Sequence, residues 1–243
     1  EPVLTQAAGE CPAGGLTGSR QAGKTTPLRR LFGERCRYVS LEPPDIRAAA
    51  TADPRGFLEM FPPPVIFDEV QYAPDLLPYI KEKIDSDRES TGRFFLTGSQ
   101  NLLLMQHVTE SLAGLAAILR LLPLSRRETE SRPLASLPWE TGQDSAPASQ
   151  TSPKILWESF LRGGYPELSA HPERDISLWH ASYVQTYLER DVRSLRQVGD
   201  LSQFQHFLRA LAARNAQLLS LTELARDLGL SINTVKAWLS VLE

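Results

Sequence analysis

The amino-acid sequence predicts an α/β protein, in which a parallel β-sheet with flanking helices is followed by an all-α region. Two observations lead to this prediction. Up to about residue 124, short apolar runs bounded by turn residues alternate with segments of helical periodicity. This pattern is typical of parallel strands that are covered on both faces. From Ile155 onward only the helical periodicity continues, so we expect the all-α region to begin there.

Four apolar runs are strand candidates, with amphipathic helices between them. The strand candidates are residues 37–41, 65–67, 94–96 and 117–119. The helical faces comprise Leu28, Leu31 and Phe32 in one segment, and Leu76, Leu77, Ile80 and Ile84 in another. Residues 13–17 hold one good strand residue and two glycines. Because glycine weakens a strand interior, the pattern for a strand there is poor.

Composition narrows the class of protein. Hydrophobic residues make up 42% and charged residues 23% of the 243 residues, as in ordinary globular domains. No apolar run approaches the roughly 20 residues of a membrane span, and residues 1–10 show no signal-peptide pattern. Cys11 and Cys36 are the two cysteines, which is too few for a disulfide framework, so we expect reduced thiols in a cytoplasmic protein. The net charge of −3 gives no overall attraction to nucleic acid.

The chain is expected to fall into four segments. Residues 1–125 form the α/β domain, and the Pro/Ser/Thr/Glu-rich residues 126–153 read as a linker or long loop. Residues 154–199 are expected to be helical. Residues 200–243 are expected to form a helix–turn–helix that is part of a winged helix, because Ser220 and Glu223 form a capping-box pattern and Gly229 can end the first helix.

The motif Gly-Ser-Arg-Gln-Ala-Gly-Lys-Thr at residues 18–25 fits the phosphate-binding pattern G-x-x-x-x-G-K-[ST] at every fixed position. Its glycines let backbone N–H groups point at phosphate oxygens, Lys24 can reach the β and γ phosphates, and Thr25 can offer its hydroxyl to Mg²⁺. The predicted nucleotide-binding residues are Gly18, Ser19, Arg20, Gln21, Ala22, Gly23, Lys24, Thr25 and Thr26. The alternative is a Gly-rich turn that resembles such a loop by accident.

Two further motifs follow at strand ends, where α/β folds bind their ligands. The apolar run 65–67 ends in Asp68 and Glu69. Asp68 is then placed to hold Mg²⁺ through water, and Glu69 to act as general base toward an attacking water. The run 94–96 is followed by Thr97, Gly98 and Ser99, where a hydroxyl could orient the water or touch the γ-phosphate. The alternative for Asp68 and Glu69 is a solvated acidic turn, and the alternative for residues 97–99 is a simple Thr-Gly turn.

These motifs and their order give the chain a family resemblance. The other segments that show this resemblance are residues 67–74, 96–100, 111–114, 122–125, 163–167 and 187–192. With the loop at 18–26, they resemble the AAA_14 family of bacterial and archaeal AAA-type ATPases, which carry a C-terminal helical region called DUF4143. The resemblance implies a P-loop NTPase fold, ATP and Mg²⁺ at the loop, Asp68 and Glu69 as the Walker-B pair, and Ser99 as a sensor-like residue.

Two departures from the family pattern bear on function. Leu115 stands where the family usually has an arginine, a residue that can stabilise charge on the transferring phosphate. Arg190, in the segment 187–192, is a candidate to take the place of that arginine. Family members usually continue past the position of Glu243, so the chain looks like a fragment or a product with a shortened C-terminus.

The function that these observations favour is a cytoplasmic, Mg²⁺-dependent ATPase that hydrolyses ATP to ADP and phosphate. The alternative is a DNA-binding regulator that uses the helix–turn–helix, with nucleotide as a switch. Charge argues against a strong DNA reader, because the four acidic and four basic residues of 200–243 balance. A protein partner and a homo-oligomer both stay open, and no membrane association is expected.

Overall fold

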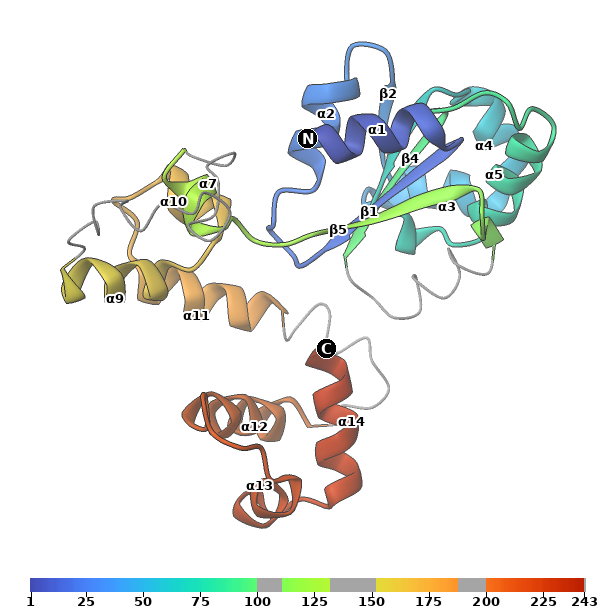
Figure 1. Ribbon diagram of the computed structural model, residues 1–243. Coiled ribbons are helices and arrows are strands. Elements are labelled where there is room, and N and C mark those ends of the chain that lie inside the picture. Colours follow the sequence, from blue (N-terminus) through green and yellow to red (C-terminus); the bar gives the residue numbers. More distant parts are fainter. Residues whose placement is uncertain (100–110, 132–151, 188–199, 243) are drawn as a thin grey trace. The chain divides into compact units, whose positions relative to one another are not determined.

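The computed structural model describes residues 1–99, 111–131, 152–187 and 200–242. It contains two compact units, residues 1–172 and 173–243 (Figure 1). The first holds the sheet, and the elements described in the second are all helices.

Five parallel strands form the sheet of the first unit, as the sequence predicts. They are β1 (Ala13–Gly18), β2 (Arg37–Ser40), β3 (Val65–Asp68), β4 (Phe94–Ser99) and β5 (Ala116–Leu121). Their order is β2-β3-β4-β1-β5. β1 is central despite its glycines, because it pairs with β4 on one side and with β5 on the other along its whole length. Hydrogen bonds to two neighbours therefore outweigh the poor strand propensity of this segment.

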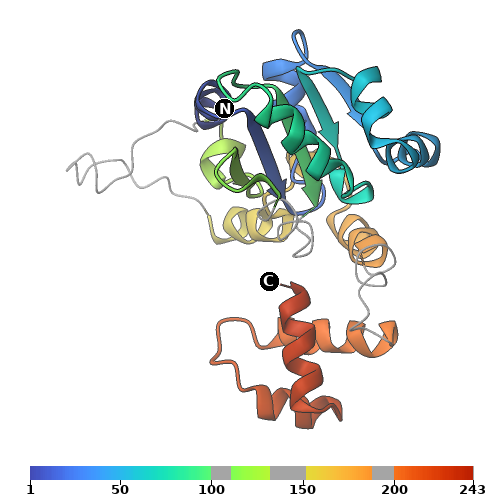
Figure 2. The same cartoon turned by 90° about the vertical axis from the view of Figure 1, so that its right-hand side faces the viewer.

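Helices cover both faces of the sheet (Figure 1, Figure 2). α1 (Pro2–Glu10) and α2 (Thr25–Phe32) cover one face, where the buried cluster includes Leu16, Ile66 and Phe95. α3 (Pro44–Ala52), α4 (Pro54–Met60) and α5 (Leu76–Asp85) cover the other, and a 3₁₀ turn, η1 (Val70–Tyr72), precedes α5. The sequence analysis did not predict α1, α3 or α4.

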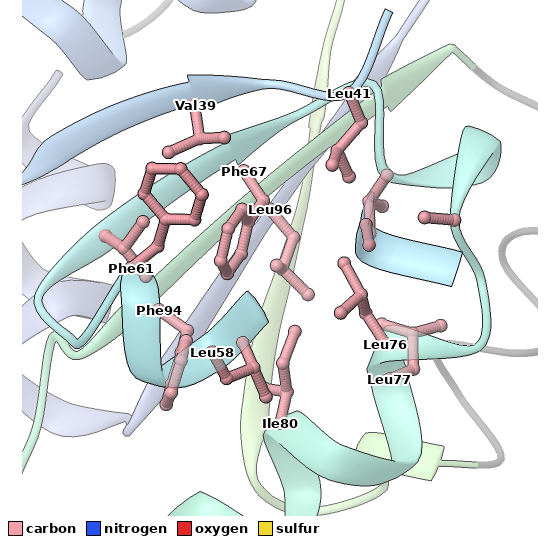
Figure 3. Close-up of a cluster of buried hydrophobic side chains, with 14 of the residues drawn as sticks. Val39, Leu41, Leu58, Phe61, Phe67, Leu76, Leu77, Ile80, Phe94 and Leu96 are labelled. Carbon is pink, nitrogen blue, oxygen red and sulfur yellow. The ribbon is translucent and has the colours of Figure 1, made fainter. Parts of the chain in front are cut away.

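The larger core lies between the sheet and α3–α5 (Figure 3). Side chains two apart on a strand point to the same face, so Val65 and Phe67 enter this core while Ile66 enters the other. The predicted helix face of α5 is fully buried: Leu76, Leu77, Ile80 and Ile84 are each 0% exposed. These two cores fix the strand ends that carry the polar motifs.

Short helices follow β5. They are α7 (Arg126–Thr129), α9 (Pro153–Arg162) and α10 (Pro166–Ala170). α7 lies within the predicted linker and begins with a capping box between Ser125 and Glu128; residues 132–151 of that linker lie outside the described part. The backbone N–H of Leu124 donates to the carbonyl of Gly164 at 2.7 Å, which holds the segment before α10 against the chain that leaves β5.

The second unit contains α11 (Ile176–Tyr187), α12 (Leu201–Ala213), α13 (Leu221–Leu228) and α14 (Ile232–Leu242). α12, α13 and α14 share a small core of Phe204, Phe207, Leu224, Ala225, Val235 and Trp238. α13 and α14 form the predicted helix–turn–helix, with Gly229 in the left-handed region between them. On α14, Trp238 is 3% exposed and belongs to this core, whereas Leu242 is 36% exposed.

The Leu124–Gly164 contact yields a stability prediction. A Cβ on Gly164 would collide with backbone atoms of Leu124, and forcing an atom into a packed contact costs about 1–3 kcal/mol. We therefore expect Gly164→Ala to lower the free energy of unfolding by about that amount in urea titrations. Gly9→Ala is the control, because a Cβ there meets nothing within 4 Å; since Gly9 lies in α1, we expect its free energy of unfolding to stay equal or to rise. A midpoint for Gly164→Ala equal to that of the unmodified protein would show that this contact is loose.

Candidate functional site

Three polar motifs meet at the carboxyl edge of the sheet. β1 ends at Gly18, β3 at Asp68 and β4 at Ser99. Because the strands are parallel, the residues that follow them lie along one edge, which is where open α/β sheets bind ligands. The predicted phosphate-binding loop connects β1 to α2 at this edge (Figure 1).

The two fixed glycines of the loop are required by the backbone. A Cβ on Gly18 would collide with the carbonyl oxygen of Leu121 in β5. Gly23 has φ +83°, a conformation that L side chains rarely adopt, and it lies against Pro166 of α10. Gln21 is also left-handed, with φ 58°. Left-handed residues of this kind form tight turns, and turns that combine left- and right-handed residues can bind anions through their backbone N–H groups.

The loop gathers positive and polar groups and holds no acidic residue. Lys24 is only 6% exposed, and its ammonium donates to the carbonyl oxygens of Gly18 at 3.2 Å and Ser19 at 3.0 Å. The hydroxyl oxygen of Ser19 is buried and has no hydrogen-bond partner in the described structure. A buried cation beside an unsatisfied hydroxyl fits an anionic ligand such as a phosphate group.

Asp68 joins this loop to the neighbouring strands. It is 8% exposed and accepts hydrogen bonds from three hydroxyls. Thr25, the first residue of α2, donates to its two oxygens at 3.1 and 3.2 Å. Tyr38 of β2 donates to Oδ2 at 2.6 Å, and Thr97 of β4 donates to Oδ1. Three different elements thus hold one carboxylate in place.

Tyr38 belongs to the site although the sequence analysis did not select it. Burial, and next the hydrogen bond to Asp68, raise the pKa of its phenol above the ordinary value, so the hydroxyl stays protonated and can serve as a donor. The guanidinium of Arg29 lies 4.9 Å from the centre of its ring. Only the order of the strands, with β2 beside β3, brings Tyr38 to Asp68.

Glu69 has a strained backbone next to Asp68. Its φ of 59° and ψ of 49° are left-handed, which is uncommon for a residue with a side chain. Its N–H donates to the hydroxyl of Thr97 at 3.3 Å, and its carboxylate accepts a hydrogen bond from the amide of Gln71. The carboxylate is therefore oriented by a neighbour that the sequence analysis had not singled out.

The remaining predicted residues have less defined surroundings. Ala22 is buried, and Gln21 and Thr26 are exposed. Ser99 ends β4 at the expected edge, but its side chain lies outside the described part. Thr97, two residues earlier, supplies the hydroxyl that contacts Asp68 and Glu69.

Leu115 lies at the opposite edge of the sheet. It immediately precedes β5 and accepts a backbone hydrogen bond from Ala13, the first residue of β1. The loop follows the other end of these strands, about 20 Å away at the ordinary rise of a strand. A side chain at position 115 therefore does not reach the loop of its own chain. Arg190 lies outside the described residues.

The helix–turn–helix lacks an excess of basic groups. Arg214 pairs with Asp227, and Arg226 lies 3.6 Å from the same carboxylate. On α14, Asn233 and Lys236 are exposed, while the Thr234 hydroxyl bonds to Ser231. No strand occurs in the described part of 200–242, so the winged-helix part of the expectation is not confirmed.

Two further properties of the described residues bear on the class of site. They contain no cluster of three or more His, Cys, Asp or Glu side chains that could hold a metal. Asp68 and Thr25 could hold a magnesium ion together with phosphate oxygens, as is usual for this ion. Among the helices described, none has both the length and the apolar character needed to cross a membrane.

Comparison with protein families divides the chain in two. Residues 12–130 match the AAA_14 family, described as an AAA domain. Residues 153–243 match a domain of unknown function, DUF8612. The second match differs from the DUF4143 region that the resemblance implied, so that expectation is not confirmed.

Two curated relatives and one solved structure are similar to the chain. They include the uncharacterized proteins Rv2008c of Mycobacterium tuberculosis and Mb2031c of Mycobacterium bovis. Each is 32% identical to this chain over an alignment that covers 98% of the chain but 49% of the relative, so the chain spans about half the length of these proteins. The Walker-type ATPase PABY2304 of Pyrococcus abyssi shares its fold, with a TM-score of 0.50 and 15% identity over 97% of this chain and 93% of that one. Residues 12–130 are thus similar to an AAA domain, and the chain shares the fold of that Walker-type ATPase, with a parallel sheet and the predicted phosphate-binding loop at its carboxyl edge.

Proposed function

We propose that this protein binds ATP together with Mg²⁺ and hydrolyses it to ADP and phosphate. The observation that carries the proposal is the hydrogen bond between Thr25 and Asp68. It joins the phosphate-binding loop to the strand-end carboxylate, and these are the two groups that P-loop ATPases use to hold Mg²⁺ beside the phosphates.

The residues of the loop would bind the triphosphate. Lys24 would exchange the neutral carbonyls of Gly18 and Ser19 for charged phosphate oxygens, which accept stronger hydrogen bonds. Thr25 and Asp68 would hold Mg²⁺. A metal bound there supplies positive charge that offsets the negative charge of the phosphates.

Glu69 is the proposed general base. It would take a proton from a water molecule as the water oxygen attacks the γ-phosphorus, and the bond from that phosphorus to the β–γ bridging oxygen would break, with its electron pair leaving on ADP. The amide of Gln71 already orients this carboxylate. Glu69 would afterwards release the proton to solvent.

The first prediction concerns binding. We expect Lys24→Ala to weaken ATP binding by about 10- to 150-fold, the factor that corresponds to hydrogen bonds with a charged partner. Equilibrium titration with a fluorescent ATP analogue measures this change. Lys81→Ala is the matched control, because Lys81 lies on α5 and pairs with Asp85 at the surface. Unchanged affinity in Lys24→Ala would mean that the nucleotide site is wrongly placed.

The second prediction separates binding from turnover. Glu69→Gln keeps the shape of the side chain but cannot accept a proton, so we expect ATP binding to persist while phosphate release falls by about 10²- to 10⁴-fold. Glu59→Gln, on the exposed surface of α4, is the control. Turnover equal to that of the unmodified protein would remove Glu69 from the role of base.

The DNA-binding alternative is tested by fluorescence polarisation over a range of salt concentrations. Because Arg214 and Arg226 already lie beside Asp227, we expect no binding of duplex DNA with the steep salt dependence that several phosphate contacts produce. Steep salt-dependent binding without phosphate release would favour the regulator over the ATPase.

A further inference from the structure

Tyr38 contacts the proposed metal site but belongs neither to the phosphate-binding loop nor to the strand-end motifs. It lies on β2, opposite Ile66 in the pairing with β3, and Ser40 lies opposite Asp68. Side chains two apart on a strand share a face, so Tyr38 and Asp68 are diagonal neighbours on the same side of the sheet. The phenol spans this diagonal and donates to Oδ2 of Asp68 at 2.6 Å.

We infer that Tyr38 is a positioning residue for the Mg²⁺ site, whose hydroxyl holds Asp68 in the orientation that serves the metal. This inference rests on the proposed function and deepens it. Partners that orient a metal-binding side chain contribute to metal affinity without touching the metal.

The acceptor capacity of Asp68 supports this role. An ionised carboxylate has about four acceptor sites. Thr25, Tyr38 and Thr97 each contribute one hydroxyl proton, which leaves room for about one further donor, such as a metal-bound water. Because the hydroxyls come from separate elements, the plane of the carboxylate is fixed before any ligand arrives.

Tyr38 is itself held in place at both ends. Its ring is partly buried against the core beneath α1 and α2, and the guanidinium of Arg29 lies over the ring. Arg29 lies one helical turn after Thr25 on α2, so the same helix that supplies the loop threonine also steadies the phenol. Packing alone would be satisfied by phenylalanine. The hydroxyl adds the contact with the carboxylate.

The test measures the Mg²⁺ requirement of nucleotide binding in the full chain. A fluorescent ATP analogue at fixed concentration is titrated with Mg²⁺, and the concentration that gives half of the Mg²⁺-dependent binding signal is recorded. We expect Tyr38→Phe to raise that concentration on the order of tenfold. Binding of the analogue in EDTA should not change, because it depends on the loop and not on the metal, and it also reports whether the variant is folded.

Tyr79→Phe is the matched control. Tyr79 also lies near an arginine, with Arg55 5.4 Å from its ring centre, but it packs against the core on the other face of the sheet. A Mg²⁺ requirement in Tyr38→Phe that equals that of Tyr79→Phe and of the unmodified protein would overturn the inference, and so would a lower one. If the unmodified protein binds the analogue no better with Mg²⁺, or if Lys24→Ala binds as well as it does, the proposed function itself fails.

Discussion

The buried carboxylate of Asp68 is the interaction on which the arrangement of the site depends. A charge that is 8% exposed is costly unless hydrogen bonds replace the lost water. Here the replacements come from Thr25, Tyr38 and Thr97, which belong to α2, β2 and β4. Moving any of these elements would leave either the carboxylate or a hydroxyl without its partner. These hydrogen bonds, which offset the cost of burying the carboxylate, therefore hold the loop in place relative to strands β2, β3 and β4.

The sheet makes this convergence possible, and its central strand shows how tertiary pairing outweighs local preference. β1 holds two interior glycines, yet it pairs with β4 and β5 along its whole length. Gly14 lies against the ring of Phe95, since a Cβ there would be 3.4 Å from it, in ordinary van der Waals contact, and Phe95 stacks on Phe32 of α2. The strand that looks weakest in the sequence is therefore next to the residues that pack the helix following the loop.

Structural features that depend on short segments could be predicted from the sequence, whereas features that depend on the order of the strands could not. The loop at 18–25, the carboxylates after β3 and the parallel sheet follow from motifs and periodicity within a few residues of one another. Tyr38 could not be selected in this way, because nothing before the structure places β2 beside β3. The same reason applies to position 115. The family pattern suggests that an arginine there would act at the phosphates, whereas the sheet puts this position at the far edge.

Two of the four non-glycine residues with left-handed backbones in the described part lie where the proposed chemistry takes place. Glu69 and Gln21 both have left-handed backbones, and each such residue costs on the order of 1–3 kcal/mol. At Glu69 the surroundings hold the conformation, since its N–H bonds to Thr97 and its carboxylate to Gln71. Thr97 therefore donates to the carboxylate of Asp68 and accepts from the backbone N–H of Glu69. Because one hydroxyl serves both residues, the position of the Asp68 carboxylate and the backbone conformation of Glu69 constrain each other in the protein without its ligands.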